Sequence, residues 1–289
     1  MSDRAERRSL RLGGRRVADY VWRPRLPGDL SPRPYLHPVR TMAGTAVTDV
    51  MPEDHRHHLG VSVAVPDVGG ANFWGGRTFV AGRGSVPLPN HGVQHHRRWE
   101  SADEAALVHE LRWTGTDGAD LLRERRRIAA VPLGDRAWAL DFGFDLVNAT
   151  DAPLAFASPA VNGRPGAGYG GFFWRAGRGE RSVRVTGPGV DGERGLHGAR
   201  TAWLALHAAG ARAWTLVFLA DERAGDPWFV RSGDYVGVGS SLAWSEPLVA
   251  APGEGPRRRI ITVVVDGDLG PRETASTVAA VRAATSGEA

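Results

Sequence analysis

The sequence contains no cysteine, no lysine and no long apolar run. Without cysteine, disulfides, thiol catalysis and thiolate metal sites are excluded. No stretch approaches the roughly 20 apolar residues that cross a bilayer. The N-terminal segment lacks the apolar core of a secretory signal. These absences predict a cytoplasmic protein that has no membrane partner.

Without lysine, the basic side chains other than histidine are all arginine. Arginine's high pKa raises the calculated pI to 10.2, although the formal net charge is only +4. The arginines are spread along the chain, with short clusters at 123–127 and 257–259, and form no basic arm. We therefore predict no nucleic-acid partner.

A period of two residues dominates the chain from residue 91 onward. In the segment from Trp138 to Leu146 every second residue is large and apolar, as in a strand with one buried face. Segments 91–100 and 105–113 flank a polar connection and predict a hairpin. Only 273–284, after Pro271, has a helical pattern. The sequence predicts an all-β protein: one large antiparallel β-sandwich over 1–289 with a short C-terminal helix. Residues 1–8 and 285–289 are expected to be disordered.

Histidine is distributed unevenly. Seven of the ten histidines lie between His37 and His96, and His55, His57 and His58 directly precede a strand-like segment at 59–65. Imidazole serves as acid, base or metal ligand near neutral pH. We expect the fold to bring these rings together in one polar site.

Three uses of such a site remain open. His55 and His57 point to one face of an extended chain, so they could hold a divalent metal with a third histidine and a carboxylate. The candidates for these further ligands are His37, His95, His96, Glu53, Asp54 and Glu110. The same rings could exchange protons with a substrate, or could simply hydrogen-bond to loop backbone. We predict no cofactor beyond this metal.

The predicted catalytic residues combine imidazoles with carboxylates. They are His55, His57, His58, His96, Glu110 and Glu124. His57 or His96 is the expected base, with Glu110 or Glu124 as its partner. Glu124 shares one strand face with Arg126, so both can face the site.

A second group of residues is predicted to bind substrate. His37 is constrained by Pro38 to an extended backbone, and Arg40 follows on the same segment. The glycine-rich segment 161–175 allows close backbone approach. The full predicted set is His37, Arg40, Asn72, Trp74, Asn162, Arg164, Tyr169 and Trp174. Tryptophans in β-proteins more often belong to the core, which is the alternative for Trp74 and Trp174.

Several of these segments together resemble the soluble family called PmoA-like. They are Arg33 to Pro38, Asp54 to Gly60, Asn72 to Trp74, Leu122 to Arg125 and Gly163 to Gly166. The resemblance implies a sandwich of the galactose-mutarotase type and a role in carbohydrate metabolism. It implies no defined reaction.

The function expected from these observations is acid–base chemistry by histidine and glutamate on a sugar or an oxidised (keto) sugar. Epimerisation, glycoside hydrolysis and elimination all need a proton taken and a proton given. The alternatives are a non-catalytic carbohydrate-binding protein and a metal-dependent enzyme that uses the histidines. A homo-oligomer is compatible with the sequence.

Overall fold

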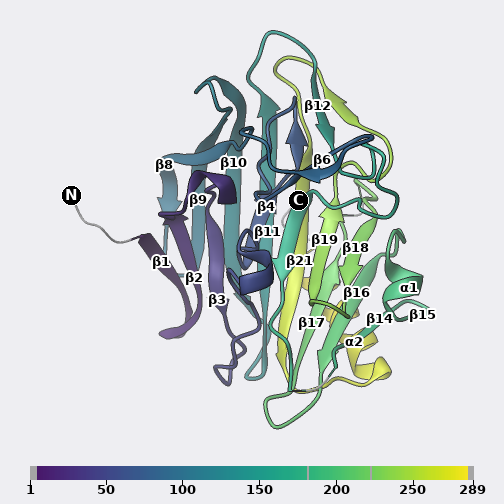
Figure 1. Ribbon diagram of the computed structural model, residues 1–289. Coiled ribbons are helices and arrows are strands. Elements are labelled where there is room, and N and C mark those ends of the chain that lie inside the picture. The colour runs from purple at the N-terminus through teal and green to yellow at the C-terminus, as the bar shows by residue number, and fades with distance from the viewer. Residues whose placement is uncertain (1–4, 181, 222, 286–289) are drawn as a thin grey trace.

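The computed structural model describes residues 5–180, 182–221 and 223–285. Two large antiparallel sheets pack against each other, and helix α2 (Pro271–Thr285) is the last element in sequence order (Figure 1). This confirms the predicted all-β sandwich with a short C-terminal helix. Within the described residues, no helix has the length and apolar character needed to cross a membrane.

The first large sheet has seven strands. In spatial order they are β1 (Glu6–Leu12), β2 (Arg15–Arg23), β3 (Tyr35–Val39), β4 (Val61–Ala64), β13 (Gly171–Arg175), β19 (Gly237–Ser241) and β18 (Trp228–Arg231).

The second large sheet has nine strands and ends at β8. In spatial order they are β15 (Val190–Asp191), β14 (Arg184–Gly187), β16 (Trp203–Ala208), β17 (Trp214–Leu219), β21 (Arg257–Asp266), β11 (Ala137–Asn148), β10 (Asp120–Pro132), β9 (Ala106–Thr114) and β8 (Val93–Ala102). The predicted hairpin is therefore confirmed as β8 and β9, which pair antiparallel.

Smaller elements cap the sandwich. A three-stranded sheet and a two-stranded hairpin consist of β20 (Leu248–Ala250), β12 (Leu154–Ala157), β5 (Asp67–Val68), β6 (Thr78–Val80) and β7 (Gly84–Val86). The short helical turns are η1 (Gly28–Leu30), η2 (Glu53–His55) and α1 (Glu193–Leu196).

The main core lies between the two large sheets. On β11 the side chains of Trp138, Phe142 and Phe144 are buried, as the alternation predicts. Phe142 meets Phe172 of β13 across the interface, with ring centroids 5.5 Å apart. Each such side chain contributes about 1.5–3 kcal/mol by leaving water.

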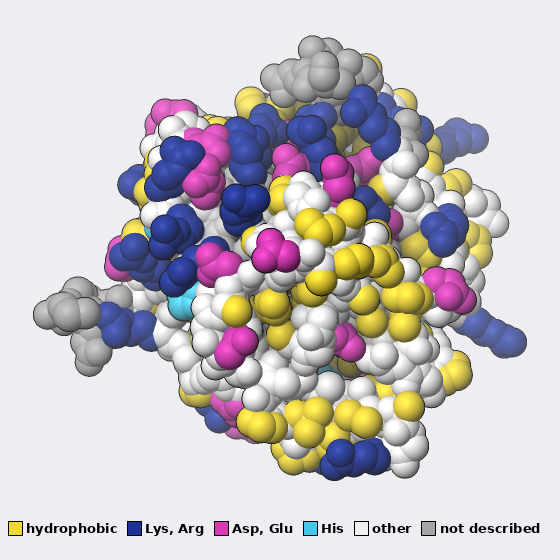
Figure 2. Space-filling model, turned by 90° about the horizontal axis from the view of Figure 1, so that it is seen from above, with side chains coloured by type: hydrophobic (Ala, Val, Ile, Leu, Met, Phe, Trp, Pro, Cys, Tyr) yellow, Lys and Arg dark blue, Asp and Glu magenta, His cyan; other side chains and the backbone are white. Residues whose placement is uncertain are grey.

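The outer face of the nine-stranded sheet is divided between α2 and charged side chains. Val278 and Val281 of α2 pack on an apolar part of this face. Elsewhere arginines pair with carboxylates on neighbouring strands, as Arg125 does with Glu100 at 2.9 Å. Figure 2 shows arginine and acidic side chains interleaved over one side of the molecule.

The N-terminal strand differs from the prediction. Residues 6–8 were expected to be disordered, but they begin β1, which pairs with β2. Residue 285 is the last residue of α2, whereas 1–4 and 286–289 lie outside the described residues. Polar residues dominate the start of β1, so its hydrogen bonds to β2, rather than apolar burial, place these residues in the sheet.

Candidate functional site

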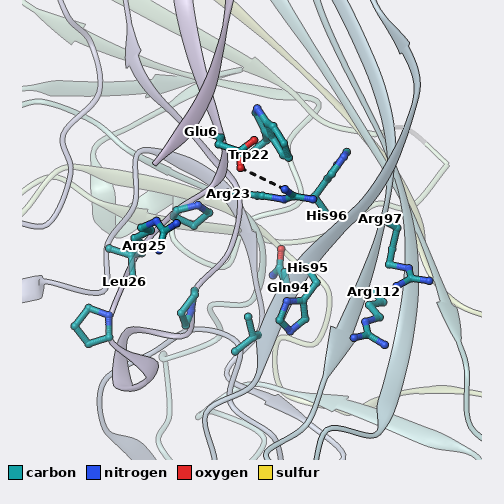
Figure 3. Close-up of a pocket in the computed structure, with 14 residues that line it drawn as sticks. Glu6, Trp22, Arg23, Arg25, Leu26, Gln94, His95, His96, Arg97 and Arg112 are labelled. Carbon is teal, nitrogen blue, oxygen red and sulfur yellow. Dashed lines mark hydrogen bonds and ion pairs between the residues drawn. The ribbon is translucent and has the colours of Figure 1, made fainter. Parts of the chain in front are cut away.

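A cavity of 680 Å³ lies beside the edge strand β8, facing the end of β2 (Figure 3). The segment after β2 is rich in proline, which has no backbone N–H and cannot extend a ladder. Gln94 of β8 does donate its N–H to the carbonyl of Pro32 at 2.9 Å. The lining residues are Glu6, Trp22, Arg23, Pro24, Arg25, Leu26, Pro27, Pro32, Val93, Gln94, His95, His96, Arg97 and Arg112.

The lining of the cavity is basic. It contains a single carboxylate and four guanidinium groups, those of Arg23, Arg25, Arg97 and Arg112. The carboxylate of Glu6 lies 3.3 Å from Arg23. Figure 3 shows Arg97 and Arg112 together on one side of the cavity and Arg25 on the opposite side. Guanidinium groups bind carboxylates and phosphates through paired hydrogen bonds, so this cavity suits a small anion.

His96 connects the cavity with the interior of the sandwich. Its Nδ1 lies 2.9 Å from Nδ1 of His109, and Nε2 of His109 lies 2.8 Å from the hydroxyl of Tyr20. His109 and Tyr20 are fully buried. Trp22 packs edge-on against His96, and Trp99 stacks on His109, with ring centroids 4.6 and 4.8 Å apart. The two indole rings thus hold the orientation of both imidazoles.

A buried ion pair lies behind the hydrogen-bonded row of His96, His109 and Tyr20. Arg126 donates to the two carboxylate oxygens of Glu124 at 2.6 and 2.8 Å. It also donates to the Tyr20 hydroxyl and to Oε1 of Gln94, both at 3.1 Å. Trp113 donates to Glu124 at 2.8 Å. A buried ion pair needs such additional hydrogen bonds to offset the loss of water. Glu124 therefore reaches the cavity only through Arg126 and its partners.

The imidazoles of His96 and His109 are neutral at pH 7. Burial, and to a smaller extent the positive charge of Arg23, lowers the pKa of His96 to about 4. Burial, and to a smaller extent the positive charge of Arg126, keeps the pKa of His109 well below its ordinary value. Burial raises the pKa of Tyr20, although Arg126 acts in the opposite direction. Each neutral imidazole can donate one hydrogen bond and accept another.

His55, His57 and His58 lie elsewhere, in what we call the histidine–aromatic cluster. Its other members are Trp74, Phe173 and Tyr235. The rings of His55 and His58 stack at 4.6 Å, and His57 meets His58 edge-on at 4.8 Å. His58 is buried, and its Nδ1 lies 3.1 Å from Nη1 of Arg175. Because arginine only donates, Nδ1 of His58 accepts.

Arg33 fixes the loops around this cluster. It is fully buried and donates to five oxygens at 2.7–3.2 Å: Ser62 Oγ and the carbonyls of Leu30, Ser31, Trp74 and His57. Its partners stand in for the water it has lost. The bond to the His57 carbonyl at 2.7 Å sets the position of that residue.

The structure separates the histidines that we expected in one site. His96 lines the cavity, whereas His37, His55, His57 and His58 do not. The cluster packs on β13, and β3 and β4 lie between β13 and β2. His96 is on β8, which belongs to the other large sheet. The expectation of a single histidine centre was therefore wrong.

The other predicted substrate ligands are dispersed. Nδ1 of His37 lies 3.0 Å from Oγ1 of Thr48, and Arg40 donates to the carbonyl of Gly44 at 3.3 Å. Oδ1 of Asn72 accepts from the backbone N–H groups of residues 74 and 75, both at 2.8 Å. The bonds of Arg40 and Asn72 are local bonds within loops, the bond of His37 joins β3 to the segment that contains Thr48, and none of these three residues lines the cavity.

The glycine-rich segment is divided between surface and core. Tyr169 stacks near Trp74, with ring centroids 4.5 Å apart, and hydrogen-bonds to Arg164. Asn162 donates to Asp67 at 3.1 Å. Trp174 is fully buried between the sheets. Trp174 thus belongs to the core, where it cannot contact a bound substrate directly.

Glu110 faces away from the cavity. Its side chain lies on the outer face of β9 and pairs with Arg98, whose hydrogen bond lowers the pKa of the carboxyl. Within residues 5–180, 182–221 and 223–285, no group of three or more His, Asp or Glu side chains is placed to hold a metal ion. The metal hypothesis thus gains no geometric support.

Sequence reasoning missed most of the cavity lining and the buried chain behind it. Tyr20, Trp22, Arg23, Arg97 and His109 were not selected. Two signals were present: the alternation of Tyr20 and Trp22 on one face of β2, and the run of basic residues at 95–98. Neither signal reveals that β2 faces β8, because that contact joins different sheets.

Fold and cavity together define an all-β sandwich protein with a basic, histidine-lined cavity beside one edge strand. The chain belongs to a family of unknown function (DUF6807), whose model matches residues 7–279. No curated protein matches the chain. Among solved structures, it is similar to a heparinase III at 8% identity, with a TM-score of 0.26. That similarity covers 61% of this chain and 22% of the heparinase.

The family match corrects the resemblance described above. The model that spans nearly the whole chain is DUF6807, and nothing links the protein to a PmoA-like family. The motifs that suggested it, such as Asp54 to Gly60, are short segments that serve loop and cluster packing here.

Proposed function

We propose that the protein is an enzyme that binds an oxidised sugar carrying a carboxylate, and that His96 acts on an oxygen of that sugar. The observation that carries the proposal is the cavity itself. It combines four arginines with a histidine held neutral by its surroundings. Arginines bind the carboxylate, and the imidazole acts on a hydroxyl or carbonyl oxygen.

The size of the cavity and an aromatic ring in its lining support a sugar as the ligand. A cavity of 680 Å³ falls in the range of small-molecule sites and has room for a monosaccharide or a disaccharide. Trp22 supplies an aromatic ring beside His96. Such a ring packs against the apolar C–H face of a pyranose while its polar neighbours bind the hydroxyls.

The reaction class follows from the groups at hand. Epimerisation, glycoside hydrolysis and elimination next to a carbonyl all develop charge on an oxygen. A neutral imidazole that donates to this oxygen stabilises the charge. Glu124 contributes indirectly, since its pairing with Arg126 orients Tyr20 and hence His109. Cytoplasmic location, self-association and a role in carbohydrate metabolism remain predictions.

Calorimetric titration with D-glucuronate and D-glucose tests the ligand class. We expect glucuronate to bind about tenfold or more tightly, because a charge-assisted hydrogen bond contributes about 1.5–3 kcal/mol. The double variant Arg97→Gln/Arg112→Gln should lose this preference. Arg272→Gln, an exposed arginine on α2, is the control and should keep it. Equal affinity for both sugars in the wild type would contradict the proposal.

A second experiment separates an enzyme from a carbohydrate-binding protein. In D₂O, 2-keto-D-gluconate should exchange the hydrogen next to its carbonyl faster when the wild-type protein is added, as ¹H NMR would detect, because His96 donates to the enolate oxygen while a buffer base removes the hydrogen. His96→Ala, which removes the N–H donor, should slow the exchange strongly and change the affinity much less. Binding without exchange would favour the carbohydrate-binding protein.

A further inference from the structure

The hydrogen bonds that run from Arg126 through Tyr20 and His109 to His96 have a fixed donor-to-acceptor direction. A guanidinium group has only N–H donors. Nη1 of Arg126 lies 3.1 Å from the Tyr20 oxygen, so that oxygen accepts. The hydroxyl hydrogen of Tyr20 then points to its other partner, Nε2 of His109, at 2.8 Å. Tyr20 is therefore the donor and Nε2 of His109 the acceptor.

The direction continues to the cavity. A neutral His109 that accepts at Nε2 carries its hydrogen on Nδ1. This hydrogen points at Nδ1 of His96, 2.9 Å away, which must accept. The hydrogen of a neutral His96 is then on Nε2. Over the described part of the chain, this Nε2 has no hydrogen-bond partner in the protein and is not a buried atom.

We propose that Tyr20 and His109 are positioning residues that hold His96 as its Nε2–H tautomer, so that His96 presents a hydrogen-bond donor to the ligand in the cavity. The identity of that ligand rests on the proposed function. The tautomer does not, because it follows from contacts inside the protein. His96 then polarises a carbonyl or hydroxyl oxygen and does not act as the base.

The opposite direction leaves a hydrogen without a partner. If His96 donated from Nδ1, His109 would have to donate from Nε2 to Tyr20. The Tyr20 oxygen would then accept from both His109 and Arg126, and its own hydrogen would lack an acceptor. Tyr20 is fully buried, where an unpaired donor is costly. The arrangement with every partner satisfied is the one described above.

Histidine side-chain ¹H–¹⁵N NMR of the ligand-free protein at neutral pH tests the proposal. His96→Gln and His109→Gln assign the two rings. We expect Nε2–H on His96 and Nδ1–H on His109. The reading for His109 is the diagnostic one, because Nδ1–H is the minority form of neutral histidine in water. Nε2–H on His109 would overturn the proposal.

Tyr20→Phe tests the origin of the direction. It removes the hydroxyl and keeps the ring, so His109 can return to Nε2–H and His96 must then donate from Nδ1. We expect equal fractions of both rings to change tautomer. Tyr35 is on β3 and takes no part in these hydrogen bonds, so Tyr35→Phe is the control and should leave both spectra unchanged. A change of tautomer in one ring without an equal change in the other would also overturn the proposal, because the two Nδ1 atoms share a single hydrogen.

Ligand binding separates this inference from the proposed function. If half of the His96 rings change tautomer in Tyr20→Phe, affinity for D-glucuronate should fall by at most about twofold, because only the Nε2–H rings donate to the ligand. Correct tautomers in a wild-type protein that does not bind glucuronate would refute the proposed function alone. Binding with the reverse tautomers would refute the inference alone.

Discussion

The guanidinium of Arg126 holds both carboxylate oxygens of Glu124 between the two sheets, at 2.6 and 2.8 Å, where neither side chain contacts water. The pair stands between the apolar core and the cavity. It supplies the charge on which the hydrogen-bond chain to His96 depends.

Removing one partner of this pair should destabilise the protein strongly. Glu124→Gln leaves Arg126 buried without a counter-charge, which costs about 3–5 kcal/mol of the free energy of unfolding. Glu110→Gln is the control, because Glu110 pairs with Arg98 at the surface and should cost at most about 1 kcal/mol. Urea unfolding at pH 7 measures both. Similar losses for the two variants would contradict a structural role for the buried pair.

Stability should fall on the acid side of neutrality. Burial lowers the pKa of His58 and His109, so both are neutral in the folded state. In the unfolded chain each binds a proton below a pH of about 6.5. The unfolded state thus holds more protons below that pH, and stability decreases as pH falls through this range.

Each fully buried histidine contributes roughly 1.4 kcal/mol per pH unit below its unfolded pKa. We expect the melting temperature to fall between pH 6.5 and pH 5. His58→Gln removes one of these protons and should reduce the dependence of stability on pH by about 1.4 kcal/mol per pH unit. A slope that is the same in this variant would show that His58 is protonated in the folded protein.

Affinity for an anionic sugar should depend on salt. The cavity arginines are partly exposed, and at 0.1 M salt the screening length is about 10 Å. Raising the salt from 50 to 500 mM should weaken glucuronate binding several-fold and leave any glucose binding unchanged. Calorimetry at both salt concentrations measures this. Salt-independent glucuronate binding would place the carboxylate away from the arginines.

The position of His57 depends on Gly76. A Cβ at Gly76 would lie 2.9 Å from Nδ1 of His57, and φ there is +70°. Gly82 has a similar φ of +73° but nothing within 4 Å. Gly76→Ala should therefore destabilise the protein by about 1 kcal/mol more than Gly82→Ala, since only the former displaces the ring. Equal unfolding midpoints would show that His57 moves freely.

Local pattern predicted the elements more reliably than the site. The alternation from Trp138 to Leu146 correctly placed β11, and the hairpin of β8 and β9 was found. Glu124 and Arg126 were correctly assigned to one face of their strand, because side chains alternate with a period of two. The same period says nothing about which strand lies opposite.

That limit explains the errors about the histidines. His55, His57 and His58 lie close together in sequence and do cluster, but they do not line the cavity that contains His96. His96 was joined to them only by its residue type. Its actual partner, His109, lies across a hairpin register that contains bulges, which shift pairing by a residue.

The sequence by itself determined the class of fold, the positions of most strands, the C-terminal helix and the exclusion of thiol chemistry. Alternation and turn residues act over a few neighbours, so they can be read from one chain. Only the tertiary structure decided that the end of β2, the proline-rich connection and β8 enclose a cavity, and that His96 lies in it with Tyr20 behind. Those contacts join residues far apart in the chain, and the packing of two whole sheets sets them.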